Sequence, residues 1–264
     1  MNLVIGNTSQ LSAYFPNSFE RISSRNLTTT SFSSTDRYDS VFLTFAEQRT
    51  FDASLDESDF IGINVDYTSK IVDLFENKAN RIILYGTAEL WNNCDGPISI
   101  DTKIDYKYSP YVKSKEILWN TIRNKKDSGK WKNVSIIHPF NFNSIHRKEG
   151  FLFYKIFDSL INETIHEVGN INIERDIIHP IYLVEKSISC REDIIVGSGK
   201  SINVRRFIND IFDRMRMRME DYIIEKDRSS HHQGNTFWLY SEDIYDRLLE
   251  DTVSELNKVK NEKH

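Results

Sequence analysis

Cysteine is scarce in this chain of 264 residues, where only Cys94 and Cys190 occur. Two cysteines provide neither a disulfide framework nor the ligand spacing of a zinc site, which is typical of proteins in a reducing cytosol. The sequence also lacks an apolar run approaching the roughly 20 residues that span a bilayer, and no basic region precedes its first apolar stretch. These absences predict a cytoplasmic protein that does not associate with membranes.

An excess of positive charge is missing as well. Acidic residues number 39 against 34 basic ones, which gives a net charge of −5. A general nucleic-acid binder needs a basic face to displace phosphate counterions, so this function is excluded, although a local pocket for one phosphorylated ligand is not. Hydrophobic residues make up 39% and aromatic residues 12%, enough for a core, so wholesale disorder is excluded too. The length suits one large domain or two modest ones.

The first half of the chain alternates between predicted strands and helices. Short apolar segments predict buried strands at residues 3–5, 19–24, 40–45, 81–85 and 134–137. Apolar positions at helical spacing predict helices over 63–76 and 111–123. This alternation predicts an α/β fold in which helices cover both faces of a parallel sheet.

The second half is less regular, and no internal repeat or clear linker divides the chain. The pattern there predicts two short strands around Gly169-Asn170, a strand at 194–196, and helices at 151–160, 203–215 and 241–258. The alternating Arg/Met segment 214–219 is interpreted as a helix end. His231-His232 has no carboxylate or cysteine at ligand spacing, so no metal site is predicted.

The residues after the first strand form a crude dinucleotide-binding turn. Gly6 follows Leu3-Val4-Ile5, and a helix-compatible segment starts near Ser9. Such a turn carries little side chain, so that a pyrophosphate can approach backbone N–H groups at a helix N-terminus. Serine stands at the two later glycine positions, Ser9 and Ser12, and allows this approach less readily. An ordinary strand–turn–helix unit explains the same residues.

Tyr111 and Lys115 lie four residues apart on one predicted helix face. A lysine ammonium group beside a phenol stabilises the phenolate, so the tyrosine can act as an acid or a base. The spacing alone is not specific, because it recurs in the segments Tyr182–Lys186 and Tyr222–Lys226, which fit solvated helix faces.

The surroundings of the first pair distinguish it from the other two. Ser109-Pro110 places Tyr111 at the start of a helix, and an earlier strand ends in Thr87. The threonine hydroxyl would orient a substrate hydroxyl or carbonyl group by hydrogen bonding. We therefore predict Thr87, Tyr111 and Lys115 as the catalytic residues of a site that acts on an alcohol/ketone pair.

Short segments over nearly the whole chain carry a family resemblance. They are Gly6–Leu11, Phe45–Gln48, Asn64–Thr68, Tyr85–Trp91, Ser109–Lys115, Ile137–Asn141, Arg175–His179 and Ile194–Val204. In this order they resemble the extended short-chain dehydrogenase/reductase family, in particular its epimerase/dehydratase-like branch that modifies nucleotide sugars. The match at the Tyr/Lys helix is close, whereas the opening turn is a degraded version of the family's glycine motif.

The resemblance implies a Rossmann-type doubly wound sheet over residues 1–145 and a smaller substrate-binding portion over 146–264, some of which returns to the sheet. It implies cofactor contacts by Gly6, Thr8, Ser9, Gln10, Leu11, Phe45, Ala46, Lys115 and Pro139. Asn141 would touch the nucleotide sugar, and Arg175 would grip its diphosphate. The resemblance also implies a homodimer that pairs through the helix holding Tyr111.

Departures from the family pattern concern the adenosine half of the cofactor site. Residues 24–40 are too few for a full helix and strand, so this half is expected to be trimmed. No acidic residue ends the second strand to bind a ribose 2′-hydroxyl, and Arg25 stands there instead. A cation would suit a 2′-phosphate, which favours NADPH over NADH, although Arg25 also fits a plain surface position.

The reaction favoured by these residues is the NADPH-dependent reduction, at C4, of a nucleoside-diphosphate 4-keto-6-deoxy hexose in polysaccharide sugar biosynthesis. Tyr111 would protonate the alkoxide, Lys115 would hold the nicotinamide ribose and lower the tyrosine pKa, and Thr87 would share the carbonyl oxygen.

Three alternatives stay open. A 4-epimerase uses the same residues with a rotated keto intermediate, and a 4,6-dehydratase needs an extra base, which Glu89 would supply. A catalytically silent domain that binds a nucleotide sugar or a partner protein is the third.

Overall fold

Six parallel strands form the central sheet of the computed structural model, which describes residues 1–25, 27, 37–226 and 245–263. The strands lie in the order β2-β1-β3-β4-β5-β9. Their bounds are β1 Asn2–Ile5, β2 Glu20–Ile22, β3 Ser40–Leu43, β4 Ile82–Tyr85, β5 Val134–Pro139 and β9 Ile194–Val196. Every neighbouring pair is parallel, so the predicted α/β fold with a doubly wound parallel sheet is confirmed.

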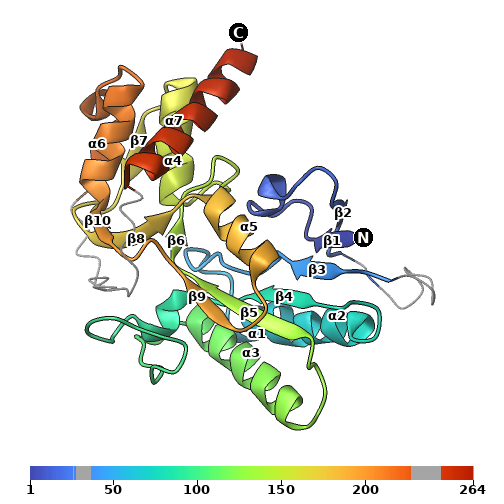
Figure 1. The fold of residues 1–264 in the computed structure, drawn as a ribbon. Coiled ribbons are helices and arrows are strands. Elements are labelled where there is room, and N and C mark those ends of the chain that lie inside the picture. The colour runs from blue at the N-terminus through green and yellow to red at the C-terminus, as the bar shows by residue number, and fades with distance from the viewer. Residues whose placement is uncertain (26, 28–36, 227–244, 264) are drawn as a thin grey trace.

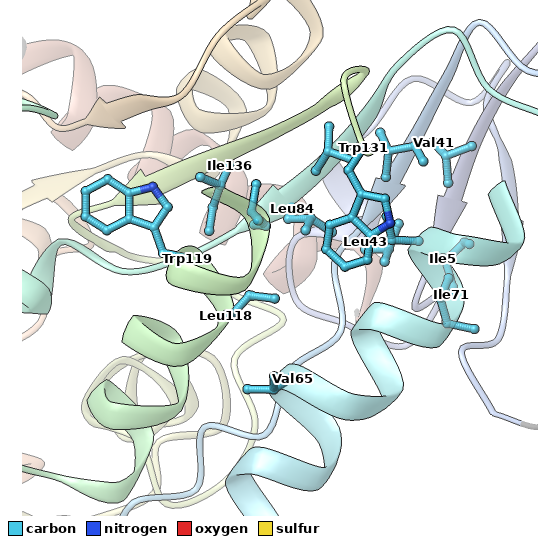
Figure 2. Close-up of a cluster of buried hydrophobic side chains, with 14 of the residues drawn as sticks. Ile5, Val41, Leu43, Val65, Ile71, Leu84, Leu118, Trp119, Trp131 and Ile136 are labelled. Carbon is cyan, nitrogen blue, oxygen red and sulfur yellow. The ribbon is translucent and has the colours of Figure 1, made fainter. Parts of the chain in front are cut away.

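One face of the sheet is covered by α2 (Thr68–Phe75) and α3 (Pro110–Asp127). Ile5 and Leu84 point to this face and pack in a buried cluster with residues of both helices. Figure 2 shows the cluster, with Trp131 beside the strand side chains. Figure 1 shows the two helices running along the same side of the strands.

The opposite face is covered by α5 (Pro180–Ser189), which comes from the second half of the chain. Val4 and Ile83 point to this face and pack with Leu183 and Val184 of α5. Because successive strand residues point to opposite sides and both sides are dry, the strands are apolar almost throughout. This explains why short continuous apolar runs, rather than alternating ones, predicted them.

The helix predicted over 63–76 is longer than expected and is not regular. It starts with α1 (Glu57–Ile61), where Asp56 and Asp59 form a capping box. A π-helical segment, Gly62–Tyr67, joins α1 to α2. The wider turn buries Asn64, a polar residue that the functional site uses.

A second core lies in the C-terminal portion, which Figure 1 shows beside the sheet. Three helices build it: α4 (Leu152–Asn162), α6 (Val204–Arg214) and α7 (Tyr245–Glu262). Its short strands are β6 (Asn141–Phe142), β7 (His166–Val168), β8 (Glu174–Ile178), β10 (Ser201–Asn203) and β11 (Ile223–Glu225). The strand β9 and the helix α5 return to the Rossmann sheet.

The helix expected from Ser9 onward is wrong. A single 3-10 turn, Ser12–Tyr14, follows β1, and Pro16 stands two residues beyond it, where its ring opposes helix continuation. The Arg21 side chain of β2 replaces the missing helical hydrogen bonds. Its guanidinium group donates to the carbonyl oxygens of Ser12, Phe15, Pro16 and Phe19.

Several smaller expectations have different outcomes. Tyr222 and Lys226 flank β11 and therefore share no helix face. Only one strand, β7, lies within 165–173, because β8 begins at Glu174. The Arg/Met segment does follow the end of α6. His231-His232 and residues 241–244 of the predicted final helix lie outside the described residues.

Within the described part of the chain, no helix is long and apolar enough to cross a membrane. The same residues contain no group of three or more His, Cys, Asp or Glu side chains that could hold a metal ion.

Candidate active site

The carboxyl ends of β1 and β3 mark the point where the order of the sheet reverses. From β1 the chain moves outward to β2 and then returns to β3 on the other side of β1. In open α/β sheets, ligands bind in the crevice beside such a point. The predicted cofactor residues that follow these two strand ends are Gly6, Thr8, Ser9, Gln10, Leu11, Phe45 and Ala46.

Gly6 lies directly against the end of β3. Its φ of +109° falls where side chains are rarely tolerated. A Cβ atom there would lie 2.9 Å from Thr44 Oγ1 and 3.0 Å from the Phe45 nitrogen. Both the backbone and the available space therefore require glycine. The N–H groups of Gly6 and Asn7 donate to the carbonyl oxygen of Ile22, at 2.9 and 3.0 Å, which ties the turn to β2.

Three backbone N–H groups of this turn, those of Thr8, Gln10 and Leu11, donate to no acceptor among the described residues. The Ser9 N–H instead closes the turn on the Gly6 carbonyl oxygen, at 2.8 Å. Neighbouring N–H donors in a turn form a concave site for an anionic group such as a diphosphate. The helix dipole that usually strengthens such a site is small here, because a single 3-10 turn follows.

The segment after β3 is held in place by Asn64, which is 1% exposed. The Glu47 N–H donates to Asn64 Oδ1 at 2.8 Å, and Asn64 Nδ2 donates to the Glu47 carbonyl oxygen and to Ser114 Oγ, both at 3.0 Å. This amide therefore fastens the segment containing Phe45 and Ala46 to α3. The tyrosine and lysine of the predicted catalytic set lie on that helix.

Thr87 and Tyr111 meet at the carboxyl end of β4. Ser109 caps α3 by accepting the Val112 N–H at 3.2 Å, and Pro110 occupies the first turn, so Tyr111 stands at the start of the helix. Thr87 caps the next 3-10 turn, Ala88–Trp91. The hydroxyl groups of Thr87 and Tyr111 share a hydrogen bond.

Lys115 lies one helical turn beyond Tyr111 and is only 3% exposed. Its Nζ atom donates to the Tyr85 carbonyl oxygen at 2.8 Å and lies 5.8 Å from the centre of the Tyr111 ring. The ammonium group has three donors, and no second hydrogen bond from it reaches a described residue. Burial lowers the pKa of Lys115 to about 8.

The pKa of Tyr111 is raised above its ordinary value, chiefly by burial and then by the negative charge of Glu89. The hydrogen bond from Thr87 and the positive charge of Arg147 lower it in part. The lysine amine is turned toward the Tyr85 carbonyl oxygen, and the lowering of the tyrosine pKa by Lys115 stays a prediction. The phenol holds its proton at neutral pH, as an acid catalyst requires.

The predicted substrate residues lie on the strands and turns around Tyr111. Glu89 is exposed on the 3-10 turn after Thr87, and its charge acts on both Tyr111 and Arg175. Asn141 of β6 pairs with Ile177 of β8, two residues from Arg175 on the same strand. The structure thus places Glu89 and Arg175 in electrostatic contact and puts Asn141 on the neighbouring strand.

Two predicted cofactor residues lie outside the turn after β1 and the segment after β3. Pro139 ends β5, beside β9. Arg25 is exposed beyond the end of β2, and its N–H donates to Ser23 Oγ at 3.1 Å. No hydrogen bond links Arg25 to the turn after β1 in the described part of the chain.

Arg147 was missed by the sequence analysis, and so was its contact with Gln48. The Arg147 Nη1 atom donates to Gln48 Oε1 at 3.4 Å, next to the segment that Asn64 fastens. Arg147 lies in a loop without hydrophobic periodicity, so no pattern marked it. Its only signal was its place six residues after Asn141.

Comparisons with known proteins agree with this fold. The profile of the NAD dependent epimerase/dehydratase family matches residues 8–185. A UDP-N-acetylglucosamine 4-epimerase from Methanobrevibacter ruminantium M1, solved with UDP-N-acetylmuramic acid, is similar in structure with a TM-score of 0.78 and 15% sequence identity. The similarity covers 97% of this chain and 98% of the epimerase.

Two further solved structures share the fold at equally low identity. RMD from Pseudomonas aeruginosa, complexed with NADPH, has a TM-score of 0.74 at 15% identity over 97% of this chain and 99% of that one. A double mutant of DesIV, a dTDP-glucose 4,6-dehydratase from Streptomyces venezuelae, has a TM-score of 0.74 at 15% identity over 99% and 97%. No curated protein matches the sequence.

Proposed function

Since the chain belongs to the NAD dependent epimerase/dehydratase family, we propose that it is a reductase that uses NADPH to reduce a nucleoside-diphosphate 4-keto-6-deoxy sugar at C4. The observation that carries the proposal is the meeting of Thr87, Tyr111 and Lys115 at the carboxyl end of β4. Asn141 and Arg175 would hold the nucleotide sugar. The NADPH preference attributed to Arg25, the homodimer and a cytoplasmic location belong to the same proposal.

The residues at the switch point fit a nicotinamide dinucleotide. Gly6 leaves no room for a side chain, and the free N–H groups after it can receive a diphosphate. Lys115 is a buried cation with unused donors, which suits the hydroxyl groups of the nicotinamide ribose. Phe45, Ala46 and Pro139 would line the nicotinamide end. When bound, the cofactor supplies the hydride.

Tyr111 supplies the proton in this reaction. Its O–H bond breaks as the new O–H bond forms on the C4 oxygen of the sugar, and the negative charge passes to the phenol oxygen. Thr87 has a single hydroxyl proton, which it would turn from the phenol to the substrate oxygen when the sugar binds. Because burial and Glu89 keep Tyr111 protonated at neutral pH, the acid form is ready before substrate arrives.

The weak diphosphate cradle supports a reductase over an epimerase or a dehydratase. The latter two return the hydride to the same sugar, so they retain one cofactor molecule through the cycle. A reductase must release the oxidised cofactor after each turnover. The short 3-10 turn after β1 gives little helix dipole to hold a diphosphate, which favours release.

Glu89 supports a second candidate, a 4,6-dehydratase. Its carboxylate acts electrostatically on Tyr111 from the turn that follows Thr87, which is where a base for the C5 proton is needed. The charge of Glu89 also acts on Arg175, the residue proposed to hold the diphosphate of the substrate, so the carboxylate lies near the proposed sugar site.

The test is NADPH consumption in the presence of 4-keto-6-deoxy nucleotide sugars, followed by nicotinamide absorbance. We expect turnover that Tyr111→Phe lowers by at least about a hundredfold without loss of NADPH binding. Tyr182→Phe, in the other described helical Tyr-x-x-x-Lys pair, is the matched control and should retain activity.

Two results would contradict the proposal. Turnover of a 4-hydroxy nucleotide sugar without net cofactor consumption would identify an epimerase or dehydratase. Failure to bind any nicotinamide cofactor would identify a silent domain.

A further inference from the structure

The turn after β1 (residues 6–15) is attached to the C-terminal helix α7, although the two segments belong to different cores. Tyr14 packs against the buried cluster between the sheet and α5, whereas Leu248 and Leu256 of α7 lie in the C-terminal core. The Tyr14 hydroxyl group donates to Glu255 Oε2 of α7 at 3.0 Å. This hydrogen bond joins residues 241 positions apart and bridges the two cores.

A second donor faces the same carboxylate oxygen. His179, at the N-cap of α5, is 4% exposed, and its Nδ1 atom accepts the Ile181 N–H at 3.3 Å. The neutral imidazole therefore carries its proton on Nε2, which lies 3.4 Å from Glu255 Oε2. Burial and the charge of Glu255 raise the pKa of Tyr14, so the phenol keeps its proton as a donor. One carboxylate thus joins the turn, the start of α5 and α7.

The loop after β6 makes another connection between the turn and α7. Asn143 Nδ2 donates to Thr252 Oγ1 of α7 at 2.6 Å, and Ser144 Oγ donates to the Gln10 carbonyl oxygen of the turn at 3.5 Å. The side chains of Asn143 and Ser144 are buried. Water therefore competes little with this polar connection.

These contacts bear on the N–H groups that are proposed to receive the diphosphate. The Gln10 carbonyl group and the Leu11 N–H group belong to one planar peptide unit. The hydrogen bond from Ser144 therefore fixes the direction of the Leu11 N–H, a donor without an acceptor among the described residues. The Tyr14 N–H donates to the Leu11 carbonyl oxygen at 3.1 Å, so the anchored tyrosine holds the next peptide unit as well.

We propose that Tyr14 and Glu255 are positioning residues for the cofactor, because their hydrogen bond ties the N–H groups that face the diphosphate to the C-terminal core. The inference rests on the proposed function only in taking this turn as the NADPH site. A single 3-10 turn follows β1, so the turn receives little support from a helix of its own, and α7 supplies support instead. Since coupling between two sites is reciprocal, NADPH in the turn should make α7 more resistant to local opening.

Amide hydrogen exchange of the full-length protein tests the link without any ligand. Tyr14→Phe removes the hydroxyl donor and keeps the ring. Exchange of the Ser9 and Ser12 amides, which are hydrogen-bonded within the turn, should become about tenfold faster, because a hydrogen bond to a carboxylate is lost. Tyr106→Phe is the matched control, since it removes a hydrogen bond of 2.8 Å from another tyrosine to Glu116 on α3. It should leave exchange in the turn unchanged.

Binding of NADPH tests the consequence for the cofactor. Tyr14→Phe should weaken NADPH binding about tenfold, measured by nicotinamide fluorescence, because the N–H donors lose their fixed direction. In the natural protein NADPH should slow amide exchange in α7, and in Tyr14→Phe it should not. A tyrosine that only stabilised the fold would leave this effect of NADPH on α7 in place.

Variants of Glu255 test the partner of the tyrosine. Glu255→Gln keeps an oxygen that can accept from Tyr14, so it should retain most of the NADPH affinity. Glu255→Ala removes this acceptor and should weaken binding as much as Tyr14→Phe does. The double variant Tyr14→Phe/Glu255→Ala should bind NADPH no more weakly than either single variant, because both changes break the same hydrogen bond.

The inference is overturned if Tyr14→Phe leaves exchange of the Ser9 and Ser12 amides unchanged, or if Tyr106→Phe speeds it equally. Equal affinity of the natural protein and Tyr14→Phe for NADPH would also overturn it. A natural protein that does not bind NADPH contradicts the proposed function, whereas the ligand-free exchange still decides whether the turn is linked to α7. The two failures are therefore distinguishable.

Discussion

Replacing Lys115 by methionine is expected to stabilise the protein while abolishing its activity. The lysine stem is buried in α3, and the side chain is 3% exposed, so methionine would fill nearly the same space. The substitution removes a buried ammonium group, whose transfer out of water costs free energy in the folded protein. Protein stability at neutral pH should therefore rise when this buried group, proposed to be catalytic, is lost.

The size of the effect follows from the pKa of Lys115, which burial lowers from 10.5 to about 8. Each unit corresponds to about 1.4 kcal/mol, so keeping the buried amine charged at neutral pH costs about 3 kcal/mol. Loss of the hydrogen bond to the Tyr85 carbonyl oxygen offsets about 1 kcal/mol of this. Lys115→Met should thus raise the free energy of unfolding by about 2 kcal/mol near neutral pH.

The pH dependence has a definite sign. Between the folded pKa of about 8 and the ordinary value of 10.5, the unfolded lysine binds a proton and the folded one does not. The stability of the natural protein therefore rises with pH across this window, whereas that of Lys115→Met does not share the rise. The advantage of the variant should disappear by the upper end of the window.

Urea unfolding of both proteins at several pH values within and below this window measures the difference. Lys70→Met is the matched control, because Lys70 is an exposed lysine on α2 and its loss should leave the pH dependence unchanged. A less stable Lys115→Met protein at neutral pH, or a stability difference independent of pH, would refute the reasoning about the buried charge.

Two further variants test the cofactor turn. Gly6→Ala should cost about 1–3 kcal/mol of stability and weaken NADPH binding, because its Cβ would collide with Thr44 and Phe45. Thermal unfolding with and without NADPH measures the loss of stability and the loss of binding. Unchanged NADPH binding would contradict the placement of the diphosphate. Arg21→Met should destabilise the protein by about 2 kcal/mol, since four carbonyl oxygens within residues 12–19 lose a charged donor. Arg218→Met, at an exposed site, is the control. If the two variants are equally stable, water replaces the guanidinium group of Arg21 and the reasoning is wrong.

The central sheet was predictable because its strands are buried on both faces. Each gives a short apolar run, and helices between the runs force parallel pairing. The absence of a regular helix after β1 was not predictable from residues 9–15 alone. Its absence depends on Pro16 and on Arg21, whose side chain satisfies carbonyl oxygens that a helix would otherwise occupy. That is a contact between a strand and the preceding loop, which local periodicity does not reveal.

The proposed catalytic residues could be selected from the sequence for a different reason. Thr87 and Tyr111 stand at chain positions with clear local signals, the end of a strand and the start of a capped helix. Their electrostatic surroundings had no such signal. The charges that act on Tyr111 come from Glu89 and Arg147, the latter from a loop with no periodic pattern. Only the fold brings the charge of this arginine close enough to act on the pKa of the phenol.

The two ends of the proposed cofactor site differ in how they are built, and this difference bears on turnover. At the nicotinamide end, Asn64 joins the segment after β3 to α3 through three hydrogen bonds. At the diphosphate end, the turn offers free N–H groups but almost no helix dipole. A rigid reacting end keeps hydride and proton donors aligned, whereas a weakly held diphosphate lets the spent cofactor leave. An enzyme that exchanges its cofactor at each turnover needs both properties, and one that retains it needs only the first.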